Sequence, residues 1–146
     1  YAVGVALLIS TLVSLIFSIA PQEMAFIAQD ATRQLGSGML IVLSIGAGLY
    51  EELIFRVVLV GGLFWVLQSL LKSKNTAYII VAIVGALLFS TVHYVGAFGD
   101  TFTMSSFVFR FLFGLALNGI FLVRGFGVAA WTHAIYDVLV VTQMFG

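Results

Sequence analysis

Hydrophobic residues run along this chain in five long stretches that are separated by short polar or glycine-containing segments. The apolar stretches are residues 1–20, 38–71, 76–95, 104–123 and 128–145. A transmembrane helix needs about 20 apolar residues, so each stretch is long enough to cross a bilayer. The pattern predicts an all-α fold, a polytopic transmembrane helix bundle of about five spans, in which residues 1–146 form a single membrane-embedded domain.

Two segments of this pattern are irregular. Residues 21–37 begin with a proline and carry three of the charged residues, which is typical of an interfacial loop or a short amphipathic helix. Residues 38–71 would form a helix of roughly 50 Å at 1.5 Å per residue, longer than a hydrocarbon core of about 30 Å. We therefore expect either one long tilted helix or a helix that is broken near Gly46 and Gly48.

Composition supports a membrane protein. The chain is 62% hydrophobic and 8% charged, with a mean hydropathy of +1.21. A soluble domain of this size could not bury so much apolar surface, so the lipid bilayer must be its main solvent. The net charge is zero and no basic block appears, so nothing suggests nucleic acid as a partner. The chain begins at Tyr1 and not at Met, and we expect it to be part of a longer protein and a larger bundle.

Charged residues inside an apolar stretch are the strongest functional signal, because each costs at least about 2.5–3.5 kcal/mol to insert. Glu51, Glu52 and Arg56 lie together in the second stretch. Glu52 and Arg56 are four residues apart, on one helix face, and are expected to pair. Glu51 is rotated by about 100° from Glu52 and has no partner on its own helix. It needs one from elsewhere in the bundle.

Other spans supply candidate partners. His93 lies near the end of the third stretch, and His133 and Asp137 stand four residues apart in the fifth. Polar groups within lipid must find one another, so we expect one shared interior cluster. Arg110 belongs to no motif, and we expect it to snorkel to the interface or to pair with Asp100 or a lipid phosphate.

Three motifs occur in order on successive hydrophobic stretches, within about residues 40–145. They are E-E-x-x-x-R (Glu51, Glu52, Arg56), F-x-x-x-H (Phe89, His93) and H-x-x-x-D (His133, Asp137). This set resembles the CAAX protease and bacteriocin-processing family of intramembrane glutamic endopeptidases. The resemblance implies an integral membrane hydrolase of a bacterial plasma membrane. Its partners would be peptide or protein substrates, prenylated ones among them.

The resemblance also implies roles for the motif residues. Glu51 and His93 would activate a water molecule for attack on a peptide carbonyl, and His133 with the residue at 137 would stabilise the oxyanion. Glu52 and Arg56 would hold the shape of the site. An ionised Asp137 cannot donate a hydrogen bond, so it would act protonated or would orient His133 by accepting its other N–H. We favour the orienting role.

Three alternatives stay open at this stage. Zn²⁺ could be held by Glu51, His93, His133 and Asp137, although the H-E-x-x-H signature of zinc proteases is absent, and we expect no metal cofactor. The same residues could belong to a non-enzymatic membrane immunity or scaffold protein. They could also form the proton or ion pathway of a transporter.

Overall fold

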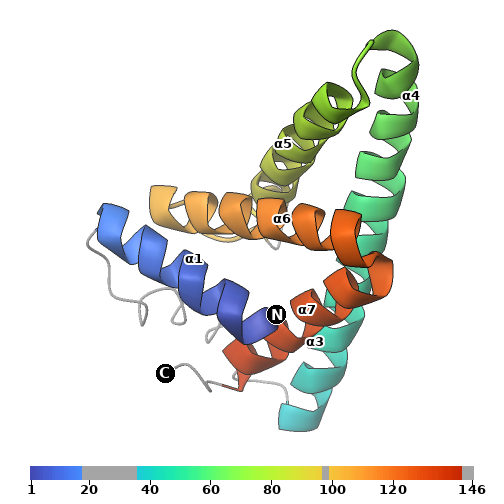
Figure 1. The fold of residues 1–146 in the computed structure, drawn as a ribbon. Coiled ribbons are helices and arrows are strands. Elements are labelled where there is room, and N and C mark those ends of the chain that lie inside the picture. Colours follow the sequence, from blue (N-terminus) through green and yellow to red (C-terminus); the bar gives the residue numbers. More distant parts are fainter. Residues whose placement is uncertain (18–35, 97–98, 143–146) are drawn as a thin grey trace.

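The computed structural model describes residues 1–17, 36–96 and 99–142, and its regular elements within these ranges are all helical (Figure 1). They are α1 (Ala2–Phe17), α3 (Ser37–Glu52), η1 (Leu53–Gly61), α4 (Gly62–Leu70), α5 (Lys74–Val92), α6 (Met104–Arg124) and α7 (Phe126–Val141). The predicted all-α fold class is confirmed. The segment 21–37, predicted to be interfacial, lies outside the described residues except at its end, where α3 begins.

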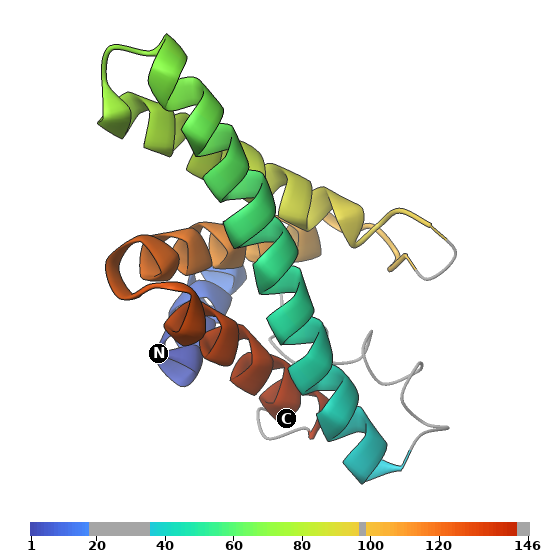
Figure 2. The same cartoon turned by 90° about the vertical axis from the view of Figure 1, so that its right-hand side faces the viewer.

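The second hydrophobic stretch forms one continuous helix. α3, η1 and α4 follow each other without interruption, and Figure 2 shows them as a single rod that crosses the whole molecule. Of the two expected forms, the break near Gly46 and Gly48 is wrong. The apolar helix Gly38–Leu70 has 33 residues, or roughly 50 Å at 1.5 Å per residue, so it must tilt or extend beyond a hydrocarbon core of about 30 Å.

The middle of this rod, η1, is a π-helix that starts directly after Glu52. Along the rod, every fourth residue from Ser44 to Val60 is buried. In an α-helix such a stripe drifts around the axis, because a turn takes 3.6 residues. A π-helix has wider turns with i→i+5 hydrogen bonds, which reverses the drift. The stripe that carries Glu52 and Arg56 therefore stays turned towards the other helices.

The remaining helices gather on that side of the rod. α5 returns from α4 and packs on α6, while α7 lies along α3 and also contacts α6 (Figures 1 and 2). α1 packs against α6 and α7. Besides Gly38–Leu70, the helices Lys74–Val92 and Met104–Arg124 are long and apolar enough to cross a membrane. α7 has 16 residues, fewer than the stretch 128–145 led us to expect, and α1 is described over 16 residues as far as Phe17.

Capping residues and a glycine set the boundaries of α5, α6 and α7, at the polar or glycine-containing segments between the hydrophobic stretches. The side chains of Ser73 and Thr103 accept hydrogen bonds from the backbone at the starts of α5 and α6, which satisfies N–H groups that have no partner within the helix. Gly125 joins α6 directly to α7 with a φ of +83°. Glycine adopts this left-handed region without steric cost, so the chain reverses within a single residue.

A close helix contact fixes the distance between α3 and α7. A Cβ atom on Gly48 would lie 2.7 Å from the backbone of Ala134, too near for any side chain. Small residues allow helices in membranes to approach closely in this way. Gly48 is one turn before Glu52, and Ala134 follows His133, so the contact brings these two polar residues within reach of each other.

The apolar residues divide between a small aromatic core and an outer surface. Ile9, Phe89, Phe109, Phe113 and Leu117 form the buried cluster. Many other large apolar side chains are exposed on the outer faces of the helices, Trp65 and Leu70 by about three quarters of their surface. In a helix bundle this apolar, the exposed faces are those that contact lipid.

Candidate active site

The site is built around Glu51 and Glu52, the last two residues of α3. Their side chains leave the helix in different directions, as their offset of about 100° requires. Glu52 is fully buried, whereas Glu51 is 29% exposed. The two neighbouring carboxylates therefore lie in different environments and form different contacts.

Glu52 contacts two side chains from different helices, Arg56 and His133. Its Oε2 atom lies 2.9 Å from Nε of Arg56, one turn further along the rod, and its Oε1 atom lies 2.8 Å from Nδ1 of His133 on α7. The approach to Arg56 is that of an ion pair and not of an aligned hydrogen bond. The predicted pairing of Glu52 with Arg56 is confirmed. An ionised carboxylate only accepts hydrogen bonds, so the Nδ1–H of His133 donates to Glu52.

This contact takes the position beside His133 that the sequence-based hypothesis gave to Asp137. The sequence-based hypothesis placed the Asp137 carboxylate on the second N–H of His133, as the group that orients the ring. The structure gives that position to Glu52, and Asp137 lies 3.6 Å from Nε2 instead, beyond a normal hydrogen bond. The i,i+4 spacing brought Asp137 near the ring but could not show which nitrogen it would face. The orienting contact comes from a different helix.

Glu51 faces both histidines. Its Oε2 atom is 3.7 Å from Nε2 of His93 and 3.9 Å from Nε2 of His133. This oxygen is buried, and it accepts no hydrogen bond from the residues that the structure describes. The three side chains come from α3, the end of α5 and α7. The expected convergence of polar groups from separate hydrophobic stretches is thus present.

His93 is held in a defined orientation by its own helix. Its Nδ1 atom lies 2.7 Å from the carbonyl oxygen of Phe89, one turn earlier. A carbonyl can only accept, so the proton is on Nδ1. In the neutral ring, Nε2 then carries a lone pair, and this atom faces Glu51. The F-x-x-x-H motif therefore supplies the hydrogen bond that sets the tautomer of the histidine.

Two aromatic rings, those of Phe89 and Phe113, pack against the polar cluster. The ring of Phe89 meets His93 and His133 edge to face, with centroids 4.9 and 5.6 Å away, and the guanidinium of Arg56 lies 4.6 Å from its centre. Phe113 packs on His133 at 5.4 Å. Sequence reasoning did not assign Phe113 to the site. With fourteen phenylalanines in the chain, no pattern distinguished this one.

The six candidate residues form a buried layer and an accessible layer. Glu52, Arg56 and His133 are 5% exposed or less, whereas Glu51, His93 and Asp137 are 24–29% exposed. The accessible layer can meet a water molecule or a substrate, and the buried layer supports it from the bundle interior. Within the described ranges, no three His, Asp or Glu side chains are arranged to hold a metal ion.

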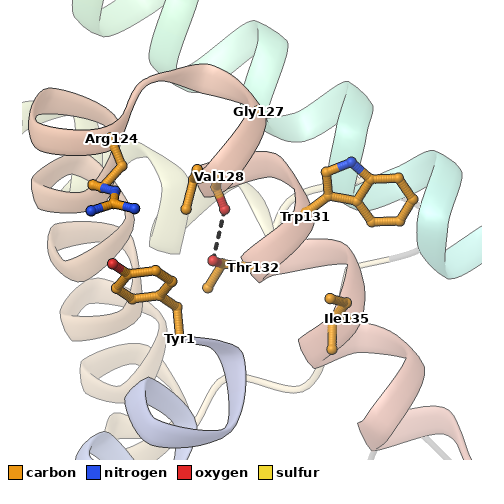
Figure 3. A pocket seen from close by; sticks show the side chains of 7 residues that line it. All are labelled: Tyr1, Arg124, Gly127, Val128, Trp131, Thr132 and Ile135. Atoms are coloured by element: carbon orange, nitrogen blue, oxygen red, sulfur yellow. Dashed lines mark hydrogen bonds between the residues drawn. The ribbon is translucent and has the colours of Figure 1, made fainter.

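A separate hollow lies elsewhere on α7. It has a volume of about 410 Å³ and is lined by Tyr1, Arg124, Gly127, Val128, Trp131, Thr132 and Ile135 (Figure 3). None of the six candidate residues borders it. Thr132 turns its hydroxyl back onto the carbonyl of Val128, as the dashed line in Figure 3 marks. The cluster around Glu51, and not this hollow, gathers the groups capable of acid–base chemistry.

Comparison with known families gives a match that covers most of the chain. Residues 33–139 fit the model of the family described as type II CAAX prenyl endopeptidase Rce1-like. The matched range is well over half of the chain and contains all six candidate residues. Neither the curated proteins nor the solved structures gave a match.

Proposed function

We propose that this chain, which belongs to the type II CAAX prenyl endopeptidase Rce1-like family, cleaves its substrate with a water molecule activated by Glu51 and His93. Family membership makes it a CAAX-protease-type peptidase of the membrane that acts on a peptide or protein substrate. It also favours the peptidase over the transporter alternative. The roles of the individual residues are our proposal and follow from the geometry of the cluster.

The position of Glu51 Oε2 carries the proposal. It is a buried carboxylate oxygen that accepts no hydrogen bond from the described residues, and it faces the Nε2 atoms of His93 and His133 within 4 Å. A neutral His93 with its proton on Nδ1 presents a lone pair there. Glu51 Oε2 and His93 Nε2 are thus two hydrogen-bond acceptors that face each other. A water molecule can donate a hydrogen bond to each of them and is expected to bind there.

In the first step, the oxygen of this water attacks the carbonyl carbon of the scissile peptide bond. One water proton passes to Glu51 as the C–O bond forms, and the carbonyl oxygen becomes an oxyanion. When the tetrahedral intermediate collapses, the C–N bond breaks and the proton held by Glu51 passes to the leaving nitrogen. The products are a new carboxylic acid and a new amine, and the proton of the acid then passes to the amine to give a carboxylate and an ammonium group. A general base placed within one water of its target contributes about 10²–10⁴-fold.

His133 is the proposed donor to the oxyanion. The Nδ1–H of His133 already donates to Glu52. A neutral imidazole has only one N–H, so Nε2 can donate only when the ring is protonated on both nitrogens and charged. The carboxylates of Glu52, Asp137 and Glu51, at 2.8, 3.6 and 3.9 Å, stabilise that charge. A charged donor fixed in a poorly hydrated site stabilises developing negative charge strongly. Asp137 would support His133 from the accessible side, and it would donate directly only in its protonated form.

The mechanism needs no metal ion. All proton transfers occur between the water, Glu51 and the leaving nitrogen, with His133 as the electrostatic partner. Glu52 and Arg56 keep the ring of His133 in place from within the bundle.

The proposed substrate is a protein or peptide whose cleaved bond lies at the membrane, with a prenylated C-terminus as the first class to test. The resemblance of the motif set further suggests the plasma membrane of a bacterium as its location. Membrane helices with apolar outer faces suit a substrate that a lipid group anchors in the same bilayer.

The decisive experiment compares the wild-type protein with Glu51→Gln in liposomes, using a prenylated peptide with a quenched fluorophore and its unprenylated form. Glu51→Gln should lose cleavage by at least about a hundredfold while it keeps the wild-type melting temperature in detergent. An equally active Glu51→Gln would refute the proposed base. A wild-type protein that folds but cleaves neither peptide would favour the non-enzymatic scaffold alternative.

A further inference from the structure

We propose that Arg110 is a positioning residue for His93. Together with Asp100, Tyr94 and Ser106 it forms a set of contacts, here called the Arg110 clamp, that fixes the chain where it leaves α5. The inference deepens the proposed function, on which it rests, because His93 is one of the two groups proposed to activate water.

The clamp satisfies the guanidinium of Arg110 with three partners. Its Nη1 atom donates to the Tyr94 hydroxyl and to Ser106 Oγ, both at 2.7 Å, and Nη2 donates to the Asp100 carboxylate. Tyr94 in turn donates to Ser106 at 2.9 Å. The expected pairing of Arg110 with Asp100 is thereby confirmed. The aromatic face of Tyr94 also lies against the guanidinium, with its centre 5.0 Å from the central carbon.

The clamp is connected to His93 in two ways, by a covalent link through Tyr94 and by a hydrogen bond from Asp100. Tyr94 is the neighbour of His93 in the chain, and the backbone N–H of Asp100 donates to the carbonyl of His93 at 2.8 Å. Asp100 is therefore tied to His93 by its backbone and to Arg110 by its side chain. α5 ends at Val92 and His93 is its C-cap residue, so the carbonyl of His93 takes its partner, the N–H of Asp100, from outside the helix.

These contacts explain why a charged residue occurs inside the fourth hydrophobic stretch, about two turns from the start of α6. Arg110 is on α6, four residues after Ser106 and on the same helix face. α6 is well anchored against α5 and α7, so a group on it is a rigid reference point. Displacing a catalytic group by about 1 Å can cost about a hundredfold in rate. A rigid tie to the end of α5 therefore keeps His93 in reach of Glu51.

The chain contains two histidines, which allows the position of His93 to be measured without any assay of proteolysis. His93 is 24% exposed and His133 only 5%, so diethyl pyrocarbonate should modify His93 first. The rate at which His93 is modified can be followed by mass spectrometry of the full chain in detergent or liposomes. Arg110→Gln should raise the modification rate of His93 by roughly fivefold through local opening, with His133 unchanged.

Arg124→Gln is the matched control, because Arg124 lies on the same helix outside the clamp. It should leave the His93 rate as in wild type. Arg110→Lys should return most of the protection, since an ammonium group can still donate to Asp100, Tyr94 and Ser106. Asp100 lies outside the helices, so Asp100→Asn is a second variant that can be used if Arg110→Gln fails to fold. It too should raise the modification rate of His93.

Cleavage assays complete the test. Arg110→Gln should lower kcat by roughly ten- to a hundredfold with KM within about twofold, as expected when His93, which holds the attacking water and does not bind substrate, is misplaced. Wild-type His93 reactivity in both Arg110→Gln and Asp100→Asn would overturn the clamp. If Glu51→Gln remains active, the proposed function fails, whereas the reactivity of His93 still decides whether the clamp positions it.

Discussion

Oε1 of Glu52 lies 2.8 Å from Nδ1 of His133, and both residues are buried. This hydrogen bond joins the second hydrophobic stretch to the fifth, across 81 positions of sequence. The other oxygen of the same carboxylate pairs with Arg56. Glu52 therefore neutralises a buried guanidinium and orients a histidine at once, so changes here should affect both the fold and the reaction.

The first prediction concerns this buried pair. Glu52→Gln and Arg56→Ala should each lower the stability of the folded protein by about 3–5 kcal/mol, because each leaves a buried charge without its partner. The melting temperature in detergent, measured by tryptophan fluorescence, checks this. Glu51→Gln is the control, since Glu51 is partly exposed and should leave the melting temperature unchanged. Equal destabilisation by all three changes would contradict the separation into a buried and an accessible layer.

The second prediction concerns the contact between α3 and α7. Gly48→Ala should push the helices apart, because its Cβ would meet the Ala134 backbone at 2.7 Å. We expect a loss of about 1–3 kcal/mol in stability and a loss of activity as Glu52 withdraws from His133. Gly46→Ala is the matched control on the same helix, where a Cβ meets nothing within 4 Å. Similar melting temperatures and activities for the two variants would show that this close approach does not hold the site.

A third prediction follows from the position of Asp137. Glu52 orients the ring of His133 and is the nearest carboxylate to stabilise its charge, so Asp137→Asn should keep at least about half of the activity, since an amide has a similar shape and can donate at any pH. Asp137→Ala should lose about tenfold or more, because it removes the polar group beside Nε2. Steady-state cleavage rates of both variants provide the measurement. This differs from what the orienting role favoured by the sequence would give, since an amide accepts the His133 N–H less strongly than a carboxylate does. An inactive Asp137→Asn would restore the carboxylate as an essential partner of His133.

The fourth prediction concerns metal ions. In the proposed mechanism, water is activated by Glu51 and His93 alone, so prolonged treatment with a chelator such as 1,10-phenanthroline should not change the cleavage rate. Metal analysis of the purified protein should find less than one equivalent of zinc. Loss of activity on chelation, reversed by added Zn²⁺ but not by Mg²⁺, would instead support the zinc alternative with Glu51, His93, His133 and Asp137 as ligands.

Much of the fold could be predicted because lipid imposes simple requirements. A helix that satisfies its own backbone groups is the main solution for an apolar stretch in a membrane, so the positions of α4, α5 and α6 follow from polar breaks such as Lys72 to Asn75. The break expected near Gly46 and Gly48 was wrong for a physical reason. Glycine permits a helix to bend, but here it permits a neighbouring helix to approach.

From the sequence alone we could expect Glu51, Glu52, Arg56, His93 and His133 to gather inside the bundle, because unpaired polar groups are too costly in lipid. The sequence also determined the pairing of Glu52 with Arg56, since i and i+4 share a helix face. Which nitrogen of His133 each carboxylate faces could be seen only in the folded protein, because it depends on how α7 packs against α3. The same packing gave Glu52, and not Asp137, the contact that orients His133, and it left Glu51 free to face both histidines.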